Sequence, residues 1–373
     1  MDHVTDALEQ KCFFKLVCGA SLTDTKMIED LCFIFTLAGA HVIDLAPTAN
    51  VIFAARRGIE KALSIQHSAL SSIPSSPHPL FPPSPLLMAS IQLDKDPHFR
   101  KVEVDYSLCD LCGACVKVCP TEAFKINSVI ARNEVTKQST NDLRNEIASS
   151  GLKPFLAMTD QQFVYLNEHC FGCNICPSYC HVNALKMIDT KPSPKQTLQE
   201  MISLGIKSIE FHFGSNYKKI EEIWDKIAES CSGMTLLSFS IGSNLLDDEE
   251  IKKAANLCYN LAGKGIILQC DGIPMSGGLE KLTKNGNNTG KSCMHVAKVI
   301  QEENLPVYLQ ISGGTNQYSY SQATKSGLNI HGVAIGSYAR KLLMPYLSNN
   351  EKVNEAVAIA KSLVNSVGSK YEG

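Results

Sequence analysis

The sequence predicts an α/β protein in which a smaller domain is inserted into a (β/α)8 barrel-like domain. Eight short apolar segments with strand character alternate with segments of helical spacing along most of the 373 residues, as in parallel βα units. The short separations between these segments favour closure into a barrel, and an open doubly wound parallel sheet is the alternative. Because cysteines gather between residues 96 and 190, we expect the barrel to comprise residues 1–95 and 191–373.

The eight expected strands are short apolar runs, rich in β-branched and aromatic residues and bounded by turn residues. In chain order they are 13–21, 41–46, 86–93, 208–213, 236–241, 265–270, 307–311 and 332–335. On the barrel interpretation, the cysteine-rich region lies between the third strand and the third helix. It would therefore emerge at the carboxyl ends of the strands, where barrel enzymes keep their active sites.

The expected helices show apolar residues at i, i+3, i+4 and i+7, the spacing of one buried face. Ile28, Leu31, Cys32 and Phe35 follow this rule, and four acids from Asp247 onward suit the start of a helix. In chain order the expected helices are 28–35, 50–66, 197–204, 220–227, one beginning near 247, and 353–360.

Two copies of the spacing CxxCxxCxxxC stand out in the inserted region. They comprise Cys109, Cys112, Cys115 and Cys119, and then Cys170, Cys173, Cys176 and Cys180. In this spacing three thiolates wrap one corner of a [4Fe-4S] cluster, and the fourth completes the cluster of the other motif. We therefore expect a ferredoxin-like domain over 96–190 with two [4Fe-4S] clusters. One is held by Cys109, Cys112, Cys115 and Cys180, and the other by Cys170, Cys173, Cys176 and Cys119.

Zinc and disulfides fit this pattern less well. Structural zinc uses four ligands, usually as two separated CxxC pairs, whereas each run here has an extra cysteine in register. Disulfides need an oxidising compartment, but the first residues resemble no signal peptide, so we expect a cytoplasmic protein. The other seven cysteines are scattered singly, and we expect at least six of them to be buried as small apolar residues.

Composition excludes several classes of function. The formal charge of -2, with both signs mixed along the chain, gives no basic stripe for nucleic acid. The most apolar stretch, 31–46, is too short and too interrupted to span a membrane as one helix. The 44% hydrophobic content is enough for a large core.

Two stretches carry no expected chemistry. Residues 64–85 are rich in serine and proline, and we expect an exposed loop. Residues 127–162 separate the cysteine runs by more than a compact ferredoxin requires. They contain a near repeat that resembles a translated palindromic insertion, which a surface loop tolerates.

Glycines after the last two expected strands form a candidate phosphate site. Gly313 and Gly314 follow the seventh strand, and Gly336 and Ser337 the eighth, where barrel proteins bind phosphate, including that of a flavin. The alternative is ordinary turns. Arg340 could add a charge to such a site, but we expect it to be a solvated surface residue. Other polar residues near expected strand ends, which could line a pocket, are Cys18, Asp44, His212, Gln269, Asp271 and Gln310.

Three segments resemble a known family. They are residues 14–21, residues 36–44 and the stretch DPHFRK at 96–101, just before the first cysteine run. These segments are similar to the light-dependent period protein (LdpA) family of photosynthetic bacteria, iron-sulfur proteins that feed redox state into the circadian clock. The resemblance implies cluster binding by the eight cysteines and a redox-sensing role. The chain departs from a simple repeat at His181, which stands where the first run has Pro120.

Three functions are compatible with these features. The first is redox sensing or one-electron transfer with a redox partner protein. The second is an oxidoreductase that passes electrons between the clusters and a flavin or phosphate-bearing ligand at the barrel mouth. In the third, the clusters only hold a binding module together. We rank it last because a barrel of this size can fold unaided.

Overall fold

The computed structural model describes most of the chain in two compact units. One unit comprises Met1–Lys101, Cys170–Cys173 and Ile188–Gly373, and the other comprises Val102–His169 and Asn174–Met187. The described residues are 3–70, 82–96, 99–128, 161–170, 172–189, 193–214, 216–242, 246–272, 291–347 and 350–368.

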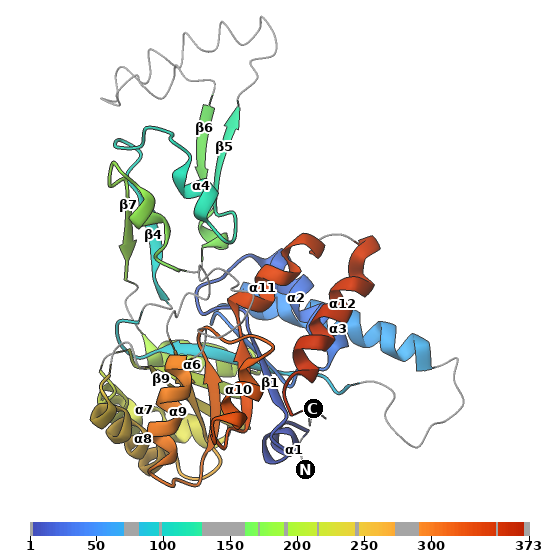
Figure 1. Ribbon diagram of the computed structural model, residues 1–373, viewed down its shortest axis with the longest axis vertical. Coiled ribbons are helices and arrows are strands. Elements are labelled where there is room, and N and C mark those ends of the chain that lie inside the picture. Colours follow the sequence, from blue (N-terminus) through green and yellow to red (C-terminus); the bar gives the residue numbers. More distant parts are fainter. Residues whose placement is uncertain are drawn as a thin grey trace, which may run out of the picture. The chain divides into compact units, whose positions relative to one another are not determined.

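The larger unit is a closed barrel of eight parallel strands, in the order β1-β12-β11-β10-β9-β8-β3-β2. The barrel prediction is therefore confirmed, and the open sheet is wrong. The strands, seen in Figure 1, are β1 (Phe13–Val17), β2 (Val42–Leu45), β3 (Leu86–Gln92), β8 (Ser208–His212), β9 (Leu236–Gly242), β10 (Ile267–Asp271), β11 (Tyr308–Ser312) and β12 (Gly332–Ile335).

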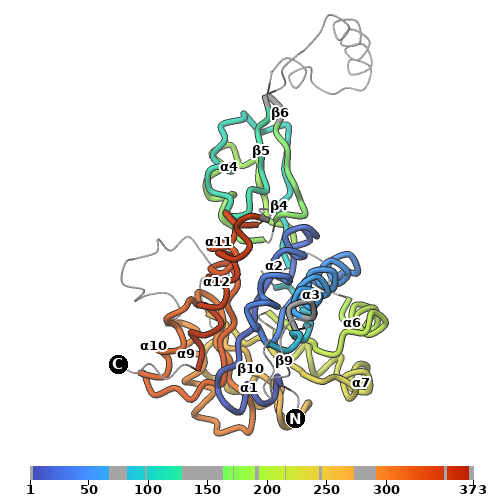
Figure 2. Tube along the Cα trace, turned by 90° about the vertical axis from the view of Figure 1, so that its right-hand side faces the viewer, coloured from blue at the N-terminus to red at the C-terminus, as the bar shows by residue number. Residues whose placement is uncertain are grey.

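A helix follows each strand, and the inserted region intervenes only between β3 and its helix. The helices of this unit are α1 (His3–Glu9), α2 (Thr25–Ala38), α3 (Ala49–Leu70), α6 (Pro194–Ser203), α7 (Lys219–Ser232), α8 (Asp248–Ala262), α9 (Lys291–Gln301), α10 (Ser319–Lys325), α11 (Ser337–Leu343) and α12 (Val353–Asn365). Figure 2 shows α2 and α3 side by side on the outside of the barrel. None of the helices in the described ranges is long and apolar enough to cross a bilayer.

Helix α2 shows how local chemistry fixes these elements. Asp24 caps its start, because its carboxylate accepts hydrogen bonds from the backbone N–H groups of Lys26 and Met27, both at 3.0 Å. Gly39 ends it at φ 88°, a left-handed conformation that a residue without a side chain adopts at little cost. Between the caps, the predicted Ile28 and Leu31 are fully buried.

Helix α1 closes the amino end of the barrel. Its buried residues Val4, Ala7 and Leu8 form one apolar cluster with residues from the starts of the strands. These strand residues are Phe13, Val42, Met88, Leu236 and Ile267. The floor of the barrel is therefore apolar.

Three segments differ from expectation. The first strand ends at Val17, not Ser21, because the chain turns at Gly19, whose carbonyl accepts from the Leu22 N–H at 3.2 Å. The loop expected at 64–85 begins later, since α3 continues to Leu70, and residues 71–81 lie outside the described ones. Of the insertion expected at 127–162, residues 129–160 lie outside the described residues, and its two ends belong to strands.

The smaller unit consists of short elements around the cysteine runs. Strands β5 (Phe124–Ser128) and β6 (Gln161–Tyr165) pair antiparallel, and β4 (Lys101–Val104) pairs with β7 (Leu185–Ile188). Between them lie the helix α4 (Ala114–Val118) and the short 3-10 helices η3 (Asn167–His169) and η4 (Cys176–Tyr179). Phe124 stacks on Phe163 and Tyr165, with ring centroids 5.7 and 5.1 Å apart, and so provides an aromatic core.

Candidate cluster loops and a polar barrel centre

Each cysteine run occupies the same place between two strands. The first run lies between β4 and β5, with Cys115 in α4 and Cys119 directly after it. The second lies between β6 and β7, with Cys176 opening η4 and Cys180 directly after it. The two runs are therefore repeats in structure as well as in spacing.

The backbone of the two loops repeats in detail. Left-handed residues occur at the same three distances from the first cysteine of each run, although their identities differ. The pairs are Leu111 and Gly172 (φ 63° and 72°), Gly113 and Asn174 (71° and 60°), and Glu122 and Asn183 (54° each). Because residues other than glycine rarely adopt this conformation, its recurrence at matched positions indicates that both loops are built for one purpose.

The fourth cysteine of each run accepts the same hydrogen bond. The Ala123 N–H donates to Cys119 Sγ at 3.2 Å, and the Ala184 N–H donates to Cys180 Sγ at 3.2 Å. Backbone N–H groups directed at sulfur stabilise a thiolate, and they are one of the means by which proteins set the potential of iron-sulfur clusters. These two sulfur atoms are therefore prepared as ligands.

The thiols of the first run interact electrostatically. Burial, together with smaller contributions from Cys109 and Cys112, raises the pKa of Cys115 to about 11. A bound metal would reverse this effect, because thiols that bind a metal are deprotonated and their negative charges are then offset by the cation. The donor set therefore fits an iron-sulfur cluster.

An ion pair lies at the rim of this loop. His181 Nε2 is 2.9 Å from Asp110 Oδ2, and Asp110 Oδ1 accepts from the Cys112 N–H at 3.2 Å. Both side chains are exposed. His169, the other histidine beside the second run, has its Nδ1 3.3 Å from the Thr121 carbonyl oxygen.

At least six of the seven scattered cysteines were expected to be buried, and six are: Cys18, Cys32, Cys231, Cys258, Cys270 and Cys293. Burial raises the pKa of Cys258 far above its usual range and that of Cys293 to about 12. Such thiols stay protonated and inert, so these residues act as small apolar side chains.

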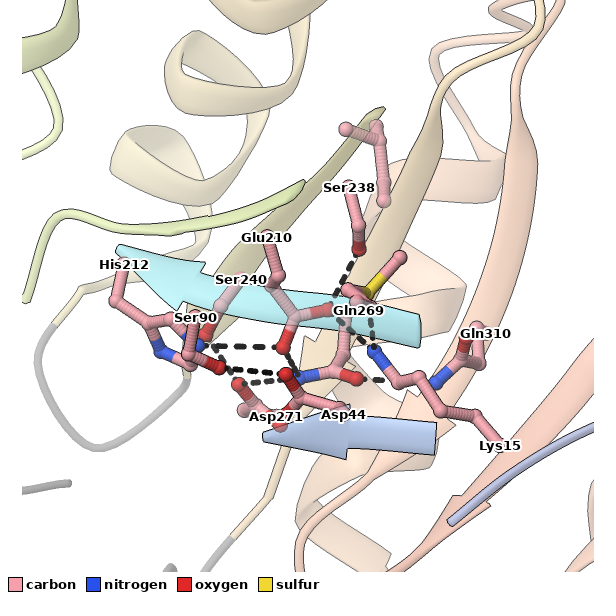
Figure 3. Close-up of polar contacts among 12 residues, drawn as sticks. Lys15, Asp44, Ser90, Glu210, His212, Ser238, Ser240, Gln269, Asp271 and Gln310 are labelled. Atoms are coloured by element: carbon pink, nitrogen blue, oxygen red, sulfur yellow. Dashed lines mark hydrogen bonds and ion pairs between the residues drawn. The ribbon is translucent and has the colours of Figure 1, made fainter. Parts of the chain in front are cut away.

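A second group of polar side chains fills the middle of the barrel (Figure 3). Its centre is an ion pair between Lys15 on β1 and Glu210 on β8, both almost fully buried. Glu210 also accepts hydrogen bonds, from Ser238 at Oε2 (2.7 Å) and from Gln269 at Oε1 (2.8 Å), and His212 Nε2 lies 3.2 Å from the same Oε1.

Two further carboxyl groups belong to this network. Asp44 accepts from Ser90 Oγ at 2.8 Å, and Asp271 accepts from Ser240 and, at 3.3 Å, from Gln269. Burial and the charge of Glu210 raise the pKa of Asp44 to about 6. Burial alone would also raise the pKa of Glu210, but Lys15 and His212 outweigh it and hold that pKa far below its usual range.

Part of this network could be predicted from the sequence. Of the polar residues expected near strand ends, all but Cys18 belong to it. Lys15, Ser90, Glu210, Ser238 and Ser240 were missed. Their signal was present, because a polar residue at every second position of a strand whose other face is buried must point into the barrel.

The glycines of the predicted phosphate site pack against neighbouring backbone. A side chain at Gly313 would meet the Gly272 backbone nitrogen at 2.6 Å, and one at Gly336 would meet the Val17 carbonyl oxygen at 3.3 Å. Ser337 Oγ accepts from Arg340 Nη2 at 3.0 Å. A phosphate or flavin site at Gly313, Gly314, Gly336 and Ser337 stays a prediction.

The expectation that Arg340 is a solvated surface residue is wrong. It is 4% exposed, and its guanidinium donates to the carbonyl oxygens of Val17 and Cys18, at 2.5 and 2.8 Å. Arg340 thus ties the last strand-helix unit to the end of β1, and burial lowers its pKa to about 10.

Comparisons with known proteins agree with this organisation. Residues 200–368 match the family model of the light dependent period A C-terminal domain, and residues 102–125, which contain the first cysteine run, match the 4Fe-4S binding domain. Light dependent period A of Synechococcus elongatus is 24% identical over 352 residues, which cover 92% of this chain and 84% of that protein. Ferredoxin-3 of Rhodobacter capsulatus is 26% identical over 87 residues, which cover 22% of this chain and 79% of that protein.

Solved structures give only weak likenesses. The tryptophan synthase alpha chain of Legionella pneumophila is 8% identical, with 100% of both chains covered and a TM-score of 0.44. A tryptophan synthase from M. tuberculosis is 7% identical, with 98% of both chains covered and a TM-score of 0.43. The barrel is therefore established by its own strand order. From these matches, the chain carries a light dependent period A C-terminal domain and a 4Fe-4S binding domain, and it is distantly homologous to the Synechococcus protein.

Proposed function

We propose that this protein binds two [4Fe-4S] clusters and uses them for redox sensing or one-electron transfer. The observation that carries the proposal is the repeat of the cysteine loops, with matched left-handed residues and matched N–H to sulfur bonds at Cys119 and Cys180. A single cluster site would leave the second set of these features without a purpose. Bound in these loops, each cluster would take up or release one electron.

The ligands are proposed as two crossed sets. Cys109, Cys112, Cys115 and Cys180 hold one cluster, and Cys170, Cys173, Cys176 and Cys119 hold the other. The place of Cys119 and Cys180 supports this division, because each follows a short helix after its own loop and precedes the strand that leaves it. A fourth cysteine in this place serves the other cluster in two-cluster ferredoxins.

Exposure in the smaller unit supports a redox partner protein. Cys112 is exposed, so electrons can reach the first loop from outside. Three large side chains of this unit are also exposed, namely Tyr106 (46%), Leu108 (47%) and Tyr179 (52%). Exposed aromatic side chains are typical of interaction surfaces. A change in cluster charge would alter how such a surface binds its partner.

Metal analysis of protein purified without air tests the cluster number. We expect about eight iron atoms per chain and visible absorption that bleaches with dithionite. Four irons per chain would reduce the proposal to one cluster, and stoichiometric zinc without iron would end it. An acid-released flavin, measured on the same sample, would favour the oxidoreductase alternative.

Paired substitutions test the crossed ligand sets. The double variant Cys112→Ala/Cys180→Ala removes two ligands of one proposed cluster, so it should keep about half of the iron. The matched variant Cys112→Ala/Cys119→Ala removes one ligand from each cluster, so it should lose nearly all of it. The buried Cys231→Ala serves as the control with full iron content. The reverse pattern in the two double variants would show that each run holds its own cluster.

A further inference from the structure

The interior of the barrel changes from apolar to polar along its axis. Inward residues at the amino end are apolar, including Phe13, Val42 and Ile267. One step further along the same strands, the inward residues are Lys15, Asp44 and Gln269, and the polar lining continues to the carboxyl ends. Barrel interiors are usually filled by bulky branched apolar side chains, so this half of the interior departs from the rule.

Stability does not account for this departure. Burying charges costs more than the ion pair returns unless its geometry is favourable, and apolar residues of similar volume often do as well or better. Charged groups retained inside a fold therefore indicate a task beyond packing. Their place in the carboxyl-terminal half of the barrel is where enzymes of this fold bind their ligands.

One buried atom of this network lacks a partner. Gln310 is 0% exposed and donates from Nε2 to Gln269 Oε1 at 3.0 Å, so its side chain points into the network. Its own oxygen, Oε1, has no hydrogen-bond partner among the residues that the structure describes. A ligand with an N–H group could satisfy such a buried acceptor.

The charges of the network call for a cation. Three carboxyl groups, those of Asp44, Glu210 and Asp271, share the interior with one ammonium group. Lys15 is paired with Glu210, and in the described part of the chain Asp44 and Asp271 accept their hydrogen bonds from neutral hydroxyl and amide groups, although Lys15 and His212 also act on Asp44 through their charge. An anion such as phosphate would meet repulsion here, and a ligand with N–H donors and a positive charge would not.

The polar centre is buried throughout, and its residues are slightly less buried toward the carboxyl ends of the strands. Exposure is 0% at Lys15, Ser238 and Gln310, and rises to 7% at Ser240 and 8% at Ser312, which stand further along the strands. We propose that this polar centre, comprising Asp44, Asp271, Gln269 and Gln310 above the Lys15–Glu210 pair, is a binding site for a small organic amine. The proposal goes beyond cluster binding and does not depend on it.

A series of four-carbon compounds tests the charge preference on the unaltered full-length protein. Putrescine, 1,4-butanediol and succinate have similar lengths but carry positive, no and negative charge. We expect measurable calorimetric binding of putrescine at millimolar concentration, at least about tenfold weaker binding of butanediol, and none of succinate. Failure of putrescine to bind, or tighter binding of succinate or inorganic phosphate, would overturn the proposal.

Isosteric variants locate the site. Asp44→Asn and Asp271→Asn should each weaken putrescine binding about tenfold or more, because each removes one charge. Asp248→Asn is the matched control, since it removes a carboxylate from an exposed position, 57% accessible, on α8. Gln310→Met keeps the side-chain volume and removes the unpartnered acceptor, so it should also weaken putrescine binding. This variant tests the site even if the aspartate variants fail to fold. Unchanged affinity in folded variants would place the amine elsewhere.

The pH dependence of binding gives an independent readout. Asp44 faces Glu210 and His212 from β8, Lys15 from β1 and Ser90 from β3, and its pKa is raised to about 6. A bound cation favours the ionised carboxyl group, so putrescine should bind more tightly as the pH rises through about 6, with release of a proton. Asp44→Asn should abolish this slope. A slope that persists in Asp44→Asn would contradict the assignment of Asp44 to the site.

Discussion

At the scale of single residues, the Lys15–Glu210 pair governs the electrostatics of the barrel interior. Glu210 holds its charge because Lys15 and His212 stand beside it, and that charge in turn helps to raise the pKa of Asp44. Two carboxyl groups in one interior thus have pKa values moved in opposite directions. Such separation allows one group to stay ionised while the other exchanges a proton near neutral pH.

A double-mutant cycle should show how strongly this pair is coupled. Lys15→Met and Glu210→Gln should each destabilise the barrel by about 3 kcal/mol or more, because each leaves a buried charge without its partner. The double variant should recover much of this loss. Urea unfolding, followed by tryptophan fluorescence, measures the effect. The single tryptophan, Trp224, reports on the barrel because its ring centroid lies 6.3 Å from that of Phe239.

The control cycle uses the exposed pair of Lys219 and Glu222 on α7, whose nitrogen-oxygen distance is 2.6 Å. Solvent screens this pair, so Lys219→Met and Glu222→Gln should show almost no coupling. If the buried pair were coupled no more strongly than this exposed pair, Lys15 and Glu210 would not form the electrostatic centre of the barrel.

The sequence allowed some of these residues to be predicted and not others. Asp271 and His212 end their strands, and such positions are known to supply functional groups in barrels. The alternation in β1 indicates that Lys15 points inward, but its ion pair with Glu210 joins residues 195 positions apart, so no local pattern indicates the pair. Gln310 was expected at a strand end, but its unpartnered oxygen depends on side-chain packing that only the three-dimensional structure contains.

At the scale of elements, the two cysteine loops are held by the same backbone devices. Glu122 and Asn183, both exposed and both at φ 54°, directly precede the alanines whose N–H groups donate to Cys119 and Cys180. The left-handed residue therefore directs the N–H group toward sulfur. Asparagine tolerates this conformation better than glutamate does, and β-branched residues tolerate it least.

Substitutions at these two positions should change the rate of cluster loss in opposite directions. Asn183→Val should strain the loop by roughly 1–2 kcal/mol and speed the loss of iron to a chelator. Glu122→Asn should slow it, since it relieves strain in the other loop. Glu103→Asn is the control, because it makes the same glutamate-to-asparagine change in the strand β4. Equal rates in all three variants would mean that the left-handed positions do not support the clusters.

Element prediction succeeded where periodicity is strong. All eight barrel strands were found, and β12 was predicted with its observed bounds, because buried parallel strands read as short apolar runs. Helix α10 was not expected, since its sequence SYSQATK has no apolar spacing and depends on its neighbours for stability. Helix α1 was missed because its apolar face is formed by only three buried residues.

At the scale of the whole molecule, the barrel has a core of its own. Both apolar clusters consist of residues of the larger unit, and none comes from 102–187. A hydrophobic core of this extent can stabilise a domain without help from a metal. The hypothesis that the clusters only hold a binding module together therefore has no support from the packing.

Removal of iron should leave the barrel folded. After anaerobic chelation, we expect the Trp224 unfolding transition to shift little, because α7 and Phe239 belong to the barrel core. The proteolysis rate of the smaller unit should rise at the same time, since bound metal contributes to the folding of small metal-binding units. Loss of the barrel transition on chelation would instead support a purely structural role for the clusters.

The domain limits at 96 and 190 were predicted because the cysteines interrupt a regular alternation. The structure gives a smaller unit of Val102–His169 and Asn174–Met187, and Cys170–Cys173 groups with the larger unit. No sequence pattern indicates that this short segment groups with the larger unit. It reflects contacts made in the folded chain, which spacing alone does not encode.

The hairpin of β5 and β6 has a practical consequence. Ser128 and Gln161 are paired in register at its open end, so the ladder holds these two points together whatever the number of residues between them. Lengthening a loop whose ends are already fixed costs little entropy. This junction is therefore a natural place to splice in a reporter domain or an affinity handle while the thiolate spacing on either side is preserved.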